Sequence, residues 1–180
     1  AEIPIHIVAT DILTGGTVVL SEGPAVQAII ASAAIPVVFP PVRFEDVYLV
    51  DGAVSSNTAV KVAVDQGARR LIVLPTGYAC ALSKPPAGAV ASALHALTLL
   101  VARQLLSELK ALDGSDIEYF VLPPLCPLTG SPYDFSQSDA LIDRAIKSTD
   151  AWITDGGLEK PNVHAQLSIH KHANQKPVRP

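Results

Sequence analysis

Short apolar runs separated by polar turns dominate most of the chain. Runs rich in β-branched residues predict buried strands, and longer stretches with apolar residues at helical spacing predict helices. The strands predicted in this way cover residues 3–9, 17–20, 47–50, 71–74 and 117–122. The predicted helices cover residues 25–34, 58–66 and 87–112, with a final amphipathic helix that starts at 134–136 and stops at Gly156.

The order of these elements predicts an α/β fold with a mostly parallel sheet. Thr14-Gly15-Gly16 turns the first strand back on the second, so the two form a hairpin. The strand at 47–50, the helix that Asn57 caps and the strand at 71–74 follow one another with short links. Gly67 ends that helix. This order is typical of a βαβ unit with parallel, buried strands.

Asp51 is the candidate catalytic residue, because it follows the apolar strand 47–50 directly and precedes Gly52. The carboxyl ends of parallel strands are where open α/β sheets bind ligands. Poor solvation there would raise the pKa of a carboxyl group and suit it to act as a general base. A plain strand-to-helix turn is the alternative interpretation of Asp-Gly. Asp11 is a second candidate for a site acid. The favoured interpretation is that its side chain bonds the backbone amides of the turn that follows it.

A nucleophile to match Asp51 is missing from the sequence. The G-x-S-x-G elbow is absent, as are G-x-G-x-x-G, the Walker loop and H-E-x-x-H. Ser32 has no flanking glycine to form a sharp elbow, and Ser55 and Ser56 are better explained as turn and cap residues. The sequence also starts inside an apparent strand and contains no Met, so we expect it to be a C-terminal piece of a longer chain.

Composition excludes several classes of protein. The 180 residues are 49% hydrophobic and 17% charged, with a formal net charge of −4, which indicates a globular interior and argues against nucleic acid as a partner. Cys80 and Cys126 match no metal or redox spacing and are interpreted as free thiols. His164, His170 and His172 are interpreted as an incidental solvated cluster, so no metal or cofactor is predicted.

The helix at 87–112 is apolar almost all round in its first half. His95 and Thr98 interrupt the apolar stretch and Arg103 closes it, so a buried or interface helix is favoured over a transmembrane one. Contact with a membrane surface is the alternative. His95 is interpreted as a core histidine. Residues 1–157 form the predicted domain portion, and 158–180 are a polar tail predicted to be mobile.

The sequence resembles the C-terminal half of the catalytic domain of patatin-like phospholipases, which are bacterial and plant acyl hydrolases. The resemblance rests on segments 9–15, 31–36, 39–41 and 50–53 with Asn57, and on 67–69 and 134–152. Three positions depart from the family pattern. Ala53 replaces the second glycine of Asp-Gly-Gly, Ala59 stands where proline is common, and Val37 stands where glycine is frequent.

The resemblance implies a three-layer α/β/α fold and a Ser–Asp dyad in which Asp51 is the aspartate. The serine and a Gly-rich oxyanion loop would lie in the missing N-terminal half, and the substrates would be lipid esters such as phospholipids. No metal is implied. The predicted location is cytoplasmic, with peripheral membrane contact as an option, and the expected protein partner is the missing half or a second copy.

Two other functions stay open at this point. One is a Ser–His acyltransferase of related architecture, in which His95 or His164 would have to reach the site. The other is a catalytically inactive lipid-binding module, which the Asp-Gly-Ala sequence and the absent serine both permit.

Overall fold

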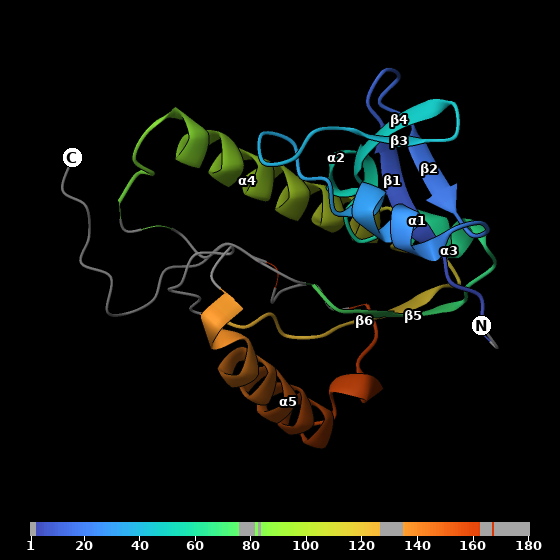
Figure 1. The fold of residues 1–180 in the computed structure, drawn as a ribbon. Helices are drawn as coiled ribbons and strands as arrows, with labels where there is room; N and C mark the ends of the chain where they lie inside the picture. The colour runs from blue at the N-terminus through green and yellow to red at the C-terminus, as the bar shows by residue number, and fades with distance from the viewer. Residues whose placement is uncertain (1–2, 76–81, 83, 127–134, 163–166, 168–180) are drawn as a thin grey trace. The chain divides into compact units, whose positions relative to one another are not determined.

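The computed structural model describes residues 3–75, 82, 84–126, 135–162 and 167. The chain divides into two compact units, residues 1–67 and 68–180, and each is considered by itself. Helices and strands occur in both (Figure 1). The predicted α/β class is therefore confirmed.

The first unit is built on a four-stranded sheet with the order β2-β1-β4-β3. Its strands are β1 (Ile7–Asp11), β2 (Thr17–Leu20), β3 (Val42–Phe44) and β4 (Val47–Asp51). All three strand pairs are antiparallel, and Ala9 lies opposite Asp51. The predicted hairpin between the first two strands is confirmed, whereas β3 was not predicted.

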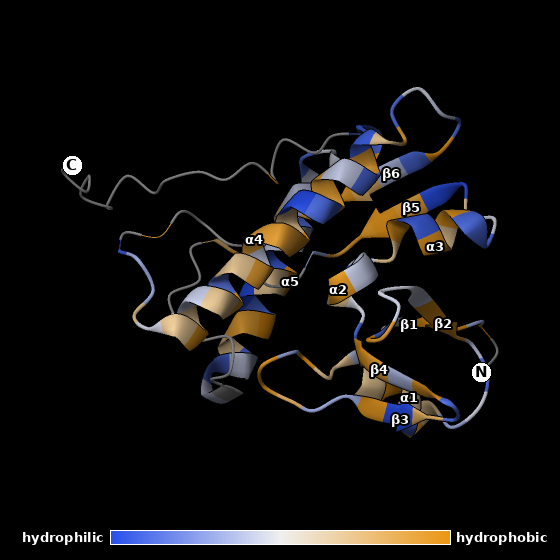
Figure 2. Ribbon diagram, turned by 90° about the horizontal axis from the view of Figure 1, so that it is seen from above, coloured by the Kyte–Doolittle hydropathy of each residue, from blue (hydrophilic) through white to orange (hydrophobic). Residues whose placement is uncertain are grey.

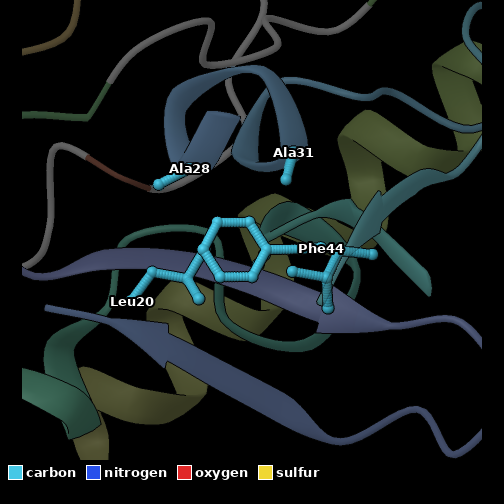
Figure 3. Packing of buried hydrophobic residues seen from close by; sticks show 6 residues of the cluster. Leu20, Ala28, Ala31 and Phe44 are labelled. Atoms are coloured by element: carbon cyan, nitrogen blue, oxygen red, sulfur yellow. The ribbon is translucent and has the colours of Figure 1, made fainter. Parts of the chain in front are cut away.

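Helix α1 (Ala25–Ser32) contacts β1, β3 and β4, and it closes the core of this unit. Ala28 and Ala31 point from α1 toward Leu20 and Phe44 of the sheet (Figure 3). Ala9 and Leu49 complete the buried cluster. Alanine at these helix positions lets the backbone of α1 approach the sheet closely.

The predicted βαβ unit is wrong. Both edges of β4 are occupied, by β1 and β3, and both neighbours run antiparallel to it. The helix expected at 58–66 is divided into α2 (Ala53–Ser56) and α3 (Val60–Asp65). The N-cap residue of α3 is Ala59, and Asn57 follows α2 with helical backbone angles, so the predicted position of the cap is also wrong.

The second unit contains the one parallel pair among the described strands. β5 (Arg70–Val73) pairs with β6 (Glu118–Val121), which restricts the predicted parallel sheet to these two strands. The helices of this unit are α4 (Ala89–Lys110), α5 (Ser138–Thr154) and the short 3₁₀ turns η1 (Phe135–Gln137) and η2 (Gly157–Glu159). Asn162 bonds the backbone of Tyr119 on the outer edge of β6, through its own N–H and its side-chain oxygen.

Helix α4 is long and apolar enough to cross a membrane by length and composition. Its buried residues, Ala102, Leu105 and Leu109, all lie in its C-terminal half, while Val90 and Leu100 are exposed. Of the two predicted alternatives, a buried helix therefore fits only the C-terminal half, and an interface helix stays a prediction. Ser92 and Thr98 each donate a hydrogen bond to a carbonyl of the same helix, at Gly88 and Leu94.

The cysteine prediction is corrected at Cys126, which is disulfide-bonded. Sequence spacing could not show this, because a single disulfide needs no characteristic spacing. Cys80, the three tail histidines and most of residues 158–180 lie outside the described residues. The domain boundary at 157 stays a prediction.

Val37 has a left-handed backbone with a φ of 75°, at the position where the family resemblance expects glycine. A β-branched residue in this region is strained by about 1–2 kcal/mol, and glycine is not. We therefore expect Val37→Gly to raise the free energy of unfolding by about 1 kcal/mol in denaturant titrations. Val38→Gly is the matched control and should lower that free energy, because Val38 has no positive φ to relieve. Equal destabilisation by both substitutions would contradict the prediction.

Candidate active site

Asp51 is the last residue of β4, and the chain turns immediately into α2. Gly52 makes this turn possible through its lack of a side chain. A Cβ atom at Gly52 would lie 2.4 Å from the Val8 carbonyl oxygen and 2.9 Å from its carbon. The Asp-Gly dipeptide is therefore required by close packing against β1, since the φ of Gly52 is an ordinary −59°.

Three neighbouring segments hold the Asp51 residue in place. Its backbone N–H donates to the Ala34 carbonyl over 3.0 Å. Its own carbonyl accepts a bond from the Thr10 hydroxyl over 2.9 Å, and Thr10 is only 1% exposed. The carboxylate oxygen Oδ1 accepts the Ala53 N–H over 2.8 Å. Buried polar groups that are fully paired in this way fix a single arrangement of the backbone.

The Asp51 carboxyl lines a pocket of about 450 Å³ within the first unit. The walls come from the residues before and within β1, from the end of α1 and from the turn after β4. The lining residues are His6, Ile7, Val8, Ile29, Ser32, Ala33, Asp51, Gly52, Ala53, Ser56, Asn57 and Ala59. A mixed apolar and polar lining around one carboxyl group is typical of a small-molecule site.

Burial raises the pKa of Asp51 above its usual value, and the Ala53 N–H bond opposes this effect by stabilising the charged form. A general base benefits from such a raised pKa, because its pKa then lies closer to the working pH.

The raised pKa predicts how stability depends on pH. The folded state favours the neutral carboxyl group of Asp51. The free energy of unfolding of the protein should therefore fall as the pH rises from below 3.8 through the raised pKa of Asp51. We expect Asp51→Asn, which mimics the neutral form, to be more stable than the wild type at neutral pH and equal to it at low pH. Denaturant titrations across this pH range would measure the difference.

Asp11→Asn is the control for this prediction, with the opposite sign. Bonds from the Leu13 N–H and the Thr14 hydroxyl lower the pKa of Asp11, so its contribution is present at neutral pH and lost as the pH falls. A stability difference for Asp51→Asn that did not change with pH would contradict the assignment. The same two bonds confirm the interpretation of Asp11 as a turn residue.

The hydroxyls near Asp51 are committed to other partners. Ser32 donates to the Val8 carbonyl over 2.7 Å, so it supports β1. The single hydrogen of the Thr10 hydroxyl is used on the Asp51 carbonyl, and Thr10 must therefore accept in its 2.9 Å bond with Ser55. Ser55 is then the donor, and its proton points away from the Asp51 carboxylate. Ser32 and Ser55 are thus structural, in agreement with the sequence interpretation.

Residues 7–64 match the family model of the patatin-like phospholipases. This part of the chain is similar to the patatin-like phospholipases. The matched segment contains β1 to β4, α1, α2, all but the last residue of α3, Asp51 and most of the pocket lining. The family is one of lipid acyl hydrolases. The match confirms the resemblance for the motifs between residues 9 and 57, whereas the segments 67–69 and 134–152 lie outside it.

The patatin-like segment tolerates alanine in its Asp-Gly-Ala sequence. Ala53 is the first residue of α2 and is not among the residues with positive φ. The family's second glycine is therefore not needed here for backbone conformation. Ser56, the last residue of α2, is buried and lines the pocket.

Sequence reasoning missed His6 as a residue of the patatin-like pocket. Its Nδ1 atom lies 2.7 Å from the Ser21 hydroxyl, across the hairpin. The hairpin register, with Ile7 opposite Leu20, was a signal that could have placed His6 beside Ser21. His95 lies on α4 in the other unit, half-buried. No cluster of metal-binding side chains occurs among the residues that the structure describes.

Proposed function

We propose that this chain carries the aspartate of a Ser–Asp dyad in a hydrolase of lipid esters, and that the serine comes from a polypeptide segment outside this sequence. One observation supports the proposal most strongly. One oxygen of the half-buried Asp51 carboxylate accepts a hydrogen bond from the Ala53 N–H. No hydroxyl of the described residues bonds the other oxygen. The carboxylate is therefore positioned, poorly solvated and available to accept a proton from the serine hydroxyl.

The reaction that this arrangement supports is acyl transfer to water through an acyl-enzyme. Asp51 removes the proton as the serine oxygen attacks the ester carbonyl, and a tetrahedral intermediate forms. The same proton then passes to the leaving alcohol oxygen as the ester C–O bond breaks. In the second half, Asp51 takes a proton from water as its oxygen attacks the acyl-serine carbonyl. The proton then passes from Asp51 to the serine oxygen as the acyl C–O bond breaks, which releases the fatty acid and restores the serine.

Asp51 can serve both halves because the Ala53 N–H keeps its orientation while its protonation changes. The backbone amide bonds the carboxylate at Oδ1 and leaves Oδ2 to exchange the proton. The bond also limits how far burial raises the pKa. A base held in this way needs no histidine relay.

The experiment that tests the proposal is labelling of the purified preparation with a fluorophosphonate, followed by intact mass of each polypeptide. We expect the label on a separate or longer polypeptide that contains G-x-S-x-G, and none on this 180-residue chain. Label on this chain would show that its own serine is the nucleophile. Absence of label from every polypeptide would favour the inactive lipid-binding module.

The Ser–His acyltransferase makes a different prediction in the same preparation. It requires a histidine whose substitution removes transfer of the acyl group to a thiol acceptor while serine labelling persists. Substitution of His95 or His164 would then block transfer. The dyad hydrolase predicts no such effect, because Asp51 is its base.

A further inference from the structure

The pocket that holds Asp51 has a buried end and an exposed end. One of its walls is formed by the consecutive residues His6, Ile7 and Val8. Val8 is buried, Ile7 is half-buried and His6 is exposed, so this wall runs from the interior to the protein surface. Gly52 packs against Val8 at the buried end, directly after Asp51. The apolar residues of β4 that lead to this end are visible in Figure 2. An ester that reacts at Asp51 would therefore extend the rest of its molecule toward His6.

The ring of His6 is held by a residue of the neighbouring strand. Its Nδ1 atom lies 2.7 Å from the Ser21 hydroxyl oxygen, and the pairing of Ile7 with Leu20 places the two residues opposite each other. A hydroxyl can donate to an imidazole nitrogen or accept from it, so this bond suits both the neutral and the protonated ring. Because Nδ1 is engaged by Ser21, Nε2 is the ring nitrogen left for a ligand. In the protonated ring Nε2 carries a hydrogen and donates it.

His6 is also the residue of the described pocket lining whose side chain can carry a positive charge. The arginine and lysine of the first unit are Arg43 and Lys61, and neither lines the pocket. Each of them lies near an acid of its own segment, Asp46 and Asp65 respectively. Within this unit, a negatively charged group in the pocket would therefore find its positive partner at His6.

The separation of His6 from Asp51 suits a ligand that contains both an ester and a phosphate. Ala9 lies opposite Asp51, and an extended chain from residue 6 to residue 9 spans about 10 Å. A phosphate beside the Asp51 carboxylate would be repelled, whereas a phosphate beside a protonated imidazole is attracted. The glycerol carbons of a phospholipid separate its esters from its phosphate, so the two groups can occupy the two ends of the pocket.

We propose that His6, held by Ser21, binds the phosphate group of a lipid ester and thereby selects phosphorylated esters over neutral ones. The proposal rests on the proposed function, because it takes the Asp51 end of the pocket as the place where the ester reacts. His6 acts here on substrate selection and takes no part in the proton transfers.

The proposal is tested with two substrates that share one acyl chain, a lysophosphatidic acid and the monoacylglycerol that lacks its phosphate. Both are assayed in the preparation that contains the serine-bearing polypeptide. We expect His6→Ala to raise KM for the lysophosphatidic acid about tenfold, because a charge-assisted hydrogen bond is lost. KM for the monoacylglycerol and both kcat values should stay within about twofold, since Asp51 is unchanged. His6→Gln should restore part of the affinity, because its amide can donate a hydrogen bond but carries no charge.

Arg43→Ala is the matched control for loss of a positive charge. Arg43 is an exposed cation of the same unit that does not line the pocket, so its removal should leave the ratio of the two KM values unchanged. Ser21→Ala releases the ring and should raise the same KM as His6→Ala, by a smaller factor. An equal change in KM for both substrates, or an equal effect of Arg43→Ala, would overturn the proposal. Unchanged KM values in His6→Ala would also overturn it, and this is the result expected if the serine-bearing segment covers His6.

A binding measurement separates failure of this proposal from failure of the proposed function. If no polypeptide takes the fluorophosphonate label, the 180-residue chain is titrated with sn-glycerol 3-phosphate and the ring signals of His6 are followed by NMR. Loss of these signals in His6→Ala assigns them. We expect them to shift with glycerol 3-phosphate and to stay in place with glycerol. Absence of a shift would overturn the proposal. An equal response to inorganic phosphate would identify an adventitious ion only and would overturn it too.

Discussion

Replacing Asp51 with asparagine is expected to lower ester hydrolysis by about 10³-fold in the preparation that contains the serine-bearing polypeptide. Asparagine keeps an oxygen that can accept the Ala53 N–H, so the turn into α2 should persist. It cannot take a proton from serine at neutral pH. The loss should appear in kcat, measured with a lysophospholipid or an activated ester, because the substrate pocket keeps its shape.

Asp11→Asn is the control for chemistry as well. Asp11 is a partly exposed acid of the same sheet whose carboxylate bonds turn groups in its own loop. Its substitution should leave kcat unchanged within about twofold. Comparison of the two variants separates the effect of losing one negative charge from the effect of losing the base. If Asp51→Asn retained most of the activity, the assignment of Asp51 to the dyad would be wrong.

The second large effect is expected from Gly52→Ala. The new methyl carbon would lie 2.4 Å from the Val8 carbonyl oxygen. Neither atom can rotate away, because the methyl carbon is bonded directly to Cα and the oxygen is part of the backbone. β1 and β4 pair in this region, with Ala9 opposite Asp51, so relief of the clash requires the strands to shift. We expect the free energy of unfolding to fall by about 3 kcal/mol, as in strongly overpacked cores.

Gly16→Ala is the comparison for this substitution. Gly16 has no positive φ, and a methyl group there would meet only the Thr14 hydroxyl, at 3.2 Å on the surface. Its cost should stay below about 1 kcal/mol in the same denaturant titration. Equal effects at the two glycines would mean that the approach of Gly52 to Val8 is relieved cheaply. A fully folded Gly52→Ala protein should also show a changed pKa of Asp51 by NMR, because the movement of β4 away from β1 displaces the Ala53 N–H that bonds the carboxylate.

The first unit could be predicted from sequence where the information was local. The hairpin, the turn role of Asp11 and the close packing of α1 follow from glycines, turn residues and alanines that act within a few positions. The strand partners of β4 could not be predicted, because pairing depends on residues far apart in the chain. Val42–Phe44 is too short to read as a strand, yet its pairing with β4 removes the edge that a βαβ unit needs.

The candidate site shows the same division. Asp51 stood out because an acid directly after an apolar strand is unusual, and the structure places it half-buried on a pocket wall. The hydroxyl of Thr10 and the ring of His6 were not identified, since their relation to the site comes from β1 lying beside β4 and β2. The family match at 7–64 covers the same segment in which the local signals were strongest.

The left-handed backbone at Ala59 has a consequence for consensus engineering. Proline is common at this position in the family resemblance, but its ring fixes φ near −65°, whereas Ala59 has a φ of 53°. Editing the chain toward the family sequence would therefore have opposite results at two of the departures. Glycine at residue 37 would suit the existing backbone, while proline at residue 59 would force the entrance of α3 and one wall of the Asp51 pocket to be rebuilt.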